Sequence, residues 1–104
     1  MANRQHRVIA TIFDKADNIL AIASNNYNKS HPIQAHFAQK AGEPERIYLH
    51  AEIAALVKLR KTDVPYRIFI SRQKRDGSMG NAKPCALCLA ALQHWKINNI
   101  SYTV

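Results

Sequence analysis

The sequence lacks several features that define whole classes of protein. Only two cysteines, Cys85 and Cys88, occur in its 104 residues, which excludes the disulfide framework of a small secreted domain. No apolar run approaches the roughly 18 residues that cross a membrane, so we expect no membrane partner. Residues 1–13 contain basic side chains but neither a long apolar run nor a small-residue cleavage site. We therefore predict no signal peptide and a cytoplasmic protein.

Acidic and aromatic residues are also scarce. Fifteen Lys and Arg residues stand against seven Asp and Glu residues, which gives a net charge of +8. This balance favours an anionic partner such as a nucleotide, a nucleic acid or a phosphorylated metabolite, although a solvated basic surface gives the same total. One Trp, four Tyr and three Phe residues are few for a surface on which successive bases of a single strand stack.

What is present fits one folded α/β domain over residues 1–104, without repeats or low-complexity segments. Segments rich in β-branched and aromatic residues are the predicted strands: 7–14, 19–24, 66–71 and 100–104. Segments with apolar residues at helical spacing are the predicted helices: 33–42, 49–61 and 84–98. A β-hairpin followed by alternating helices and strands predicts crossover connections and a mixed sheet of about four strands.

Two titratable residues interrupt the apolar segment IYLHAEIAALV, residues 47–57. His50 and Glu52 lie at the start of the second predicted helix, and Cys85 and Cys88 lie at the start of the third. Each of these helices follows a strand or a connector of the same sheet. We therefore expect their N-termini to converge at one edge of the sheet.

One imidazole and two thiolates form a ligand set suited to zinc. Cysteines at positions i and i+3 face the same side of a helix, and the helix dipole at the N-terminus favours the thiolate. Three protein ligands leave the fourth position for water, as in catalytic zinc sites. Glu52 lies two residues from His50, where a carboxylate can take a proton from that water. Cys85 and Cys88 alone also fit a thioredoxin-type redox pair, and a structural zinc site is a third interpretation.

The segments HAE, residues 50–52, and PCALC, residues 84–88, resemble the H-x-E…P-C-x-x-C signature of zinc-dependent cytidine and deoxycytidylate deaminases. The resemblance runs from the first hairpin to the last strand. It implies a cytidine deaminase-like three-layer fold in which Glu52 carries protons between water, the ring nitrogen and the leaving ammonia. By the same resemblance, the ligands of Zn²⁺ are His50, Cys85 and Cys88.

Residues outside this signature are expected to contact the substrate. The resemblance implies that an Asn just past the second strand contacts the sugar. Asn25 occupies that position and Asn26 is the alternate. The resemblance also implies that the backbone amide of Ala51 contributes to binding the base. Further candidates come from the polar loop 25–32 and the basic loop 72–83: Tyr27, Lys29, His31, Arg72, Arg75 and Lys83. The cations of the basic loop are equally consistent with a solvated surface.

These features together predict hydrolytic deamination of a cytosine nucleotide, in the first instance dCMP to dUMP. The resemblance and the small size further predict a homo-oligomer. One alternative is a deaminase that acts on cytosine or adenine in single-stranded DNA or RNA, which the +8 charge supports. A second alternative is a non-catalytic, zinc-stabilised binding module. Glu52 argues against the module, because a structural zinc site has no need of a proton carrier.

Overall fold

The computed structural model describes residues 7–26, 28–42, 49–74 and 76–104. Along the chain the elements are β1 (Arg7–Phe13), β2 (Ile19–Ser24), α1 (Pro32–Lys40), α2 (Ala51–Leu56), β3 (Arg67–Gln73), β4 (Met79–Gly80), α3 (Ala86–His94) and β5 (Asn99–Tyr102). Every predicted strand and helix is present, and the α/β fold class is confirmed. The helix predicted over 49–61 ends earlier, at Leu56.

Strands β1 and β3 form the middle of a mixed sheet. β1 pairs antiparallel with β2 on one side and with β3 on the other. The far edge of β3 is shared, because its first half pairs in parallel with β5 and its last two residues pair antiparallel with β4. The parallel pair is joined through α3, as expected for a crossover connection.

The two-residue strand β4 is a fifth strand where about four were predicted. It arises because part of the basic loop predicted over 72–83 folds back as a tight turn. The N–H of Lys74 donates to the carbonyl of Ser78 at 2.8 Å, and the N–H of Gly77 donates to the carbonyl of Lys74 at 3.0 Å. Gly77 adopts a φ of 89°, a conformation that glycine reaches without steric cost. The turn brings the chain back to the edge of β3.

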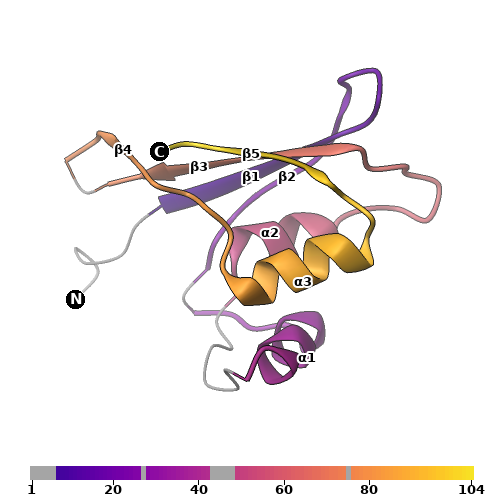
Figure 1. Ribbon diagram of the computed structural model, residues 1–104, viewed down its shortest axis with the longest axis horizontal. Helices are drawn as coiled ribbons and strands as arrows, with labels where there is room; N and C mark the ends of the chain where they lie inside the picture. The colour runs from indigo at the N-terminus through magenta and orange to yellow at the C-terminus, as the bar shows by residue number, and fades with distance from the viewer. Residues whose placement is uncertain (1–6, 27, 43–48, 75) are drawn as a thin grey trace.

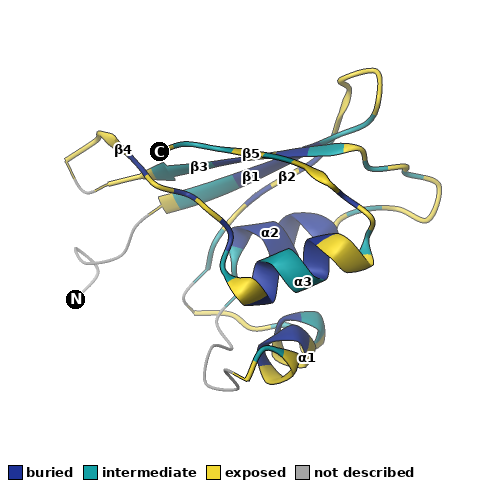
Figure 2. Cartoon of the chain, in the orientation of Figure 1, coloured by how far each residue is buried: buried dark blue, intermediate teal, exposed yellow. Residues whose placement is uncertain are grey.

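The described elements form three layers, shown in Figure 1: the sheet, the pair α2 and α3 beneath it, and α1 beyond that pair. Alternate strand residues bury against the helices, which is the period expected of a half-buried sheet: Ala10, Ile12, Ile68 and Ile70. Helix α2 is buried along its whole length (Figure 2). On the other face of the sheet, Ile22 stays 53% exposed and Phe69 37% exposed. Among the described helices, none is long and apolar enough to cross a membrane.

The sheet sets where α2 and α3 begin. An isolated bridge between Asn26 and Leu49 ties the segment just before α2 to the chain just past the end of β2. The N–H of Ala82 donates to the carbonyl of Thr103 at 2.8 Å, and the N–H of Thr103 donates to the carbonyl of Ile70 at 3.0 Å. These bonds tie the segment before α3 to the end of β3. Both helices therefore start at the same end of the sheet.

Candidate active site

Three donor side chains meet where α2 and α3 begin. His50 is the N-cap of α2, Cys85 is the N-cap of α3, and Cys88 lies in the first turn of α3. The Nδ1 atom of His50 is 3.3 Å from Sγ of Cys88 and 3.8 Å from Sγ of Cys85. All three donor atoms lie within 4.8 Å of one another. The structure thus brings together the three residues that the sequence predicts as ligands.

The spacing of these donor atoms fits a zinc ion. Tetrahedral zinc, with bonds of about 2.0–2.3 Å to nitrogen and sulfur, separates neighbouring ligand atoms by about 3.4–3.8 Å. Of the two nitrogen–sulfur separations, 3.8 Å lies at the upper end of that range and 3.3 Å lies just below it. Cys88 is buried, whereas His50 and Cys85 keep partial exposure, and within the described residues the cluster has three members. Three donors with an accessible side are typical of a catalytic rather than a structural zinc site.

The two thiols differ in acidity. A hydrogen bond from Cys88, together with the neighbouring His50, lowers the pKa of Cys85 to about 3 against the opposing effect of burial. The same hydrogen bond and burial raise the pKa of Cys88 well above its ordinary value. One sulfur of the pair is therefore a thiolate at neutral pH, which is the form that binds metal. The two cysteines are not joined by a disulfide.

Glu52 lies in the first turn of α2 and is only 6% exposed. Burial raises the pKa of its carboxyl, opposed by a backbone hydrogen bond and by the charge of His50. A hydrogen bond also joins its side chain to that of Cys88. A buried carboxyl with a raised pKa beside a metal-binding cluster is the arrangement expected of a general acid–base group.

Hydrogen bonds from earlier in the chain fix the segment that carries His50. Its backbone N–H donates to Oε1 of Gln34 at 3.1 Å. The N–H of Leu49 donates to the carbonyl of Lys29 at 2.8 Å and to that of Asn26 at 3.2 Å. Gln34 was not among the residues predicted from the sequence. It lies three positions before Phe37, on the face of α1 that is buried. A polar residue on this otherwise apolar face was the feature of the sequence that could have identified it.

Three side chains that are predicted to contact the substrate accept hydrogen bonds from backbone N–H groups. Oδ1 of Asn25 accepts the N–H of Val8 at 3.1 Å. Oδ1 of Asn26 accepts the N–H of Asn28 at 2.9 Å. His31 is the N-cap of α1, and its Nδ1 accepts the N–H of Ile33 at 3.1 Å. Contact of these three side chains with a substrate stays a prediction.

Four of the remaining predicted contacts lie among the described residues. Ala51 is the first residue of α2 and is 1% exposed. Lys29 and Lys83 are exposed, and their backbones adjoin the histidine and cysteine parts of the cluster, respectively. The guanidinium of Arg72 donates to the carbonyl of Asn81 at 3.3 Å. The two other candidates lie outside the described residues: Tyr27 and Arg75.

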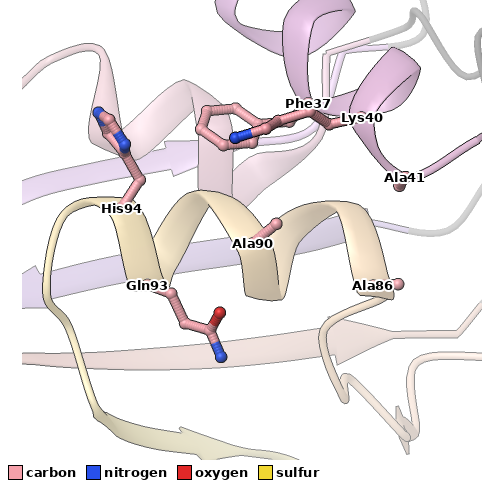
Figure 3. Close-up of a pocket in the computed structure, with 7 residues that line it drawn as sticks. All are labelled: Phe37, Lys40, Ala41, Ala86, Ala90, Gln93 and His94. Carbon is pink, nitrogen blue, oxygen red and sulfur yellow. The ribbon is translucent and has the colours of Figure 1, made fainter.

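A groove of about 450 Å³ runs between α1 and α3 (Figure 3). Its lining residues come from these two helices and the residue that follows α1: Phe37, Lys40, Ala41, Ala86, Ala90, Gln93 and His94. The lining includes neither the three donor residues nor Glu52. The groove is therefore separate from the candidate active site.

Comparison with known protein families assigns the chain. Residues 1–104 match the family model described as the cytidine and deoxycytidylate deaminase zinc-binding region. A comparison with curated proteins finds no significant match. The family match spans the whole chain, and the cluster at the two helix starts has the donor chemistry that a zinc-binding region requires. The chain therefore belongs to the cytidine and deoxycytidylate deaminase zinc-binding family.

Proposed function

We propose that the protein deaminates a cytosine nucleotide, converting dCMP and water to dUMP and ammonia. The observation that carries the proposal is the buried carboxyl of Glu52 beside three zinc-type donors, at the start of two helices. His50, Cys85 and Cys88 would hold the ion. A bound zinc would supply a water acidified to a pKa of about 7.

Glu52 is the group that moves protons. Its carboxylate takes a proton from the attacking water and delivers it to N3 of the cytosine ring. Glu52 then carries the remaining water proton from the hydroxyl on C4 to the exocyclic amine, so that the bond from C4 to nitrogen breaks, ammonia leaves and C4 keeps the oxygen as a carbonyl. The burial of Glu52 supports this role, because a carboxyl shielded from bulk water passes its proton to the substrate rather than to solvent.

Two exposed lysines support a phosphate-bearing substrate. The backbone carbonyl of Lys29 accepts the N–H of Leu49, next to His50. Lys83 precedes Cys85 by two residues. Each lysine is replaced by Met in turn. The variant that loses a phosphate contact should have a KM that is raised far more for the nucleotide than for the nucleoside. A lost charge-assisted hydrogen bond costs about 1.5–3 kcal/mol, or roughly 10–150-fold in kcat/KM.

A matched control for these variants is Lys15→Met. Lys15 is also exposed, but it lies in the turn between β1 and β2, at the opposite end of the sheet from the cluster. We expect this variant to leave both KM values unchanged. An equal effect of all three substitutions would show that overall charge, and not a phosphate contact, determines KM.

The second candidate is deamination of cytosine or adenine in single-stranded DNA or RNA, which the net charge of +8 favours. A strand contacts many cations at once, so each lysine would then contribute modestly. Binding would weaken steeply with salt as counterions are released. Small additive losses across Lys29, Arg72 and Lys83, with tight binding to oligonucleotides, would favour this candidate over a free nucleotide.

The deciding experiment measures ammonia release by the zinc-loaded protein. The panel contains cytosine and adenine nucleosides, their nucleotides and short single strands, and the Glu52→Gln variant is the control. We expect release from dCMP that the variant abolishes. Zinc binding without ammonia release from any substrate would instead support the non-catalytic binding module. Release from oligonucleotides alone would support the second candidate.

A further inference from the structure

The side chain of Gln34 is unusual in α1 because it is polar and fully buried. Its exposed fraction is 0%, and the other buried residues of the helix are Phe37 and Ala38. An apolar side chain at this position would bury no polar group of its own. A buried amide stabilises the fold only when hydrogen bonds replace its lost contacts with water. The amide at this position therefore points to a specific polar contact.

That contact is with a predicted zinc ligand. Oε1 of Gln34 accepts the backbone N–H of His50 at 3.1 Å, across sixteen positions of sequence. His50 is the N-cap of α2, with an extended backbone at φ −75° and ψ 153°. The N–H groups at a helix start have no acceptor within the helix. Gln34 accepts the N–H of His50, and the ring of His50 faces the two sulfurs.

Helix α1 also rests on the helix that carries the cysteines. The ring of Phe37 meets the ring of His94 edge-on, with centroids 5.8 Å apart, and lies 6.4 Å from the ring of Trp95. Figure 3 shows Phe37 and His94 on either side of the interface between α1 and α3. Helix α1 thus contacts α3 through Phe37 and the start of α2 through Gln34. Of these two contacts, that of Gln34 is the one made at the cluster, since Phe37 meets the end of α3 that is away from the cysteines.

We propose that Gln34 is a positioning residue for His50, and through it for zinc. The amide fixes the backbone of His50, which sets the direction of its ring and the separation of Nδ1 from the two sulfurs. Gln34 itself touches neither the ion nor the substrate. The inference rests on the ligand role of His50 given under the proposed function. Partners that orient a metal ligand typically contribute about 10–100-fold to metal affinity.

The test compares three variants. Gln34→Met keeps the length and helix propensity of the side chain but removes the acceptor. Gln34→Glu restores an acceptor oxygen at the same position. Phe37→Leu is the matched control, because it weakens the packing of α1 on α3 and leaves the amide in place. Zinc affinity is measured by competition with a chelator, and the ligand field is read from the visible spectrum of the Co²⁺-substituted protein.

We expect Gln34→Met to weaken zinc binding by about 10–100-fold and to shift the Co²⁺ spectrum. Gln34→Glu should recover most of both. Phe37→Leu should lower the unfolding midpoint and retain the wild-type spectrum and affinity. All measurements use conditions in which the metal-free protein is folded, because zinc binding and folding are otherwise coupled. Wild-type affinity and spectrum in Gln34→Met, or an equal loss of affinity in Phe37→Leu, would overturn the inference.

A second measurement needs no variant. The amide proton of His50 should exchange slowly with solvent in the metal-free wild-type protein, because Gln34 accepts it in a buried position. Exchange at the rate of an unstructured amide would overturn the positioning role alone. A wild-type protein that binds no zinc would overturn both this inference and the proposed function, so the two failures are distinguishable.

Discussion

The histidine part and the cysteine part of the site are held by different regions of the molecule. The segment before α2 is held by backbone carbonyls of the loop after β2 and by the side chain of Gln34. All of these partners precede His50 in sequence. The histidine part thus depends on α1 and its loop, and one of its supports is a single side-chain amide.

The cysteine part depends instead on the sheet edge and the end of the chain. The hydroxyl of Thr103 donates to the carbonyl of Gly80 at 2.6 Å and accepts the N–H of Arg72 at 3.1 Å. The carbonyl of Thr103 accepts the N–H of Ala82 at 2.8 Å. Residues from β3, β4 and the segment before α3 therefore meet at one threonine. The loop that leads into Cys85 is anchored to β-structure rather than to a helix.

Because the two parts have different supports, each can be weakened separately. A change in α1 should disturb the direction of His50, whereas a change at Thr103 should disturb the loop that delivers Cys85. The ion is the shared element, because it would bond to both parts. Substitutions that remove the ion should therefore have the largest effects, and substitutions that loosen one support should have smaller, local ones.

The largest effect is expected from Cys88→Ala, which removes a donor that is 0% exposed. We expect loss of zinc, loss of all turnover and a lower unfolding midpoint, because a metal-organised site contributes to folding. The variant should match the wild-type protein treated with a chelator, which is its control. Metal analysis that finds one zinc per chain in the variant would contradict the ligand role of Cys88.

Glu52→Gln should separate chemistry from metal binding. The amide has the size of the carboxyl but cannot carry a proton, so turnover should fall by about 10²–10⁴-fold or more. The zinc content should stay at the wild-type level, since Glu52 is not a predicted ligand. Near-normal ammonia release by this variant, on a substrate that the wild-type protein deaminates, would disprove the proposed mechanism.

The sequence predicted the parts of this site that local patterns determine. Two pairs of site residues each lie within one turn of a helix: His50 with Glu52, and Cys85 with Cys88. The periodicity of apolar residues predicts the strands and helices, and their order along the chain predicts that both helices pack on one sheet. The supports are different. Gln34 reaches His50 across sixteen positions, and Thr103 reaches Arg72 across 31. Such pairings depend on how the layers pack, which no local period encodes.

Helix α2 is shorter than predicted, and a turn formed by Asp63 accounts for the difference. The side chain of Asp63 accepts the N–H of Arg60 at 2.7 Å, and the N–H of Asp63 donates to the carbonyl of Arg60 at 3.0 Å. Short Asp side chains compete in this way with helical hydrogen bonds. The helix was predicted to continue to residue 61, but α2 ends at Leu56. The aspartate was visible in the sequence, and its competing turn was the overlooked signal.

Thr103→Val tests the support of the cysteine part. Valine keeps the shape of the side chain but removes the hydroxyl that bonds to Gly80 and Arg72. The loss of these bonds in a partly buried place should lower the free energy of unfolding by about 1–3 kcal/mol. Chemical denaturation measures this change. We expect zinc affinity to fall less than in Gln34→Met, since backbone pairing still holds the loop.

The control for that variant is Ser101→Ala, which lies in β5 two residues before Thr103 and is exposed to solvent. Surface substitutions of this kind usually change stability by no more than about 0.5 kcal/mol. If both variants lost the same stability, the hydroxyl of Thr103 would have no special role. The cysteine part would then rest on backbone pairing alone.

The smallest effect is expected at His31, which caps the helix that supports the histidine part. Its Nδ1 accepts the N–H of Ile33 at 3.1 Å, so His31→Ala should cost about 0.5–2 kcal/mol of stability, as for other lost N-caps. His31→Asn offers an oxygen acceptor and should restore most of this stability.

The KM for the nucleotide distinguishes capping from substrate contact. If His31 only caps α1, His31→Asn keeps the wild-type KM. If the imidazole binds the substrate, KM rises in both variants although only His31→Ala loses stability. Because a frayed start of α1 lies next to Gln34, His31→Ala should also weaken zinc binding slightly, and less than Gln34→Met does.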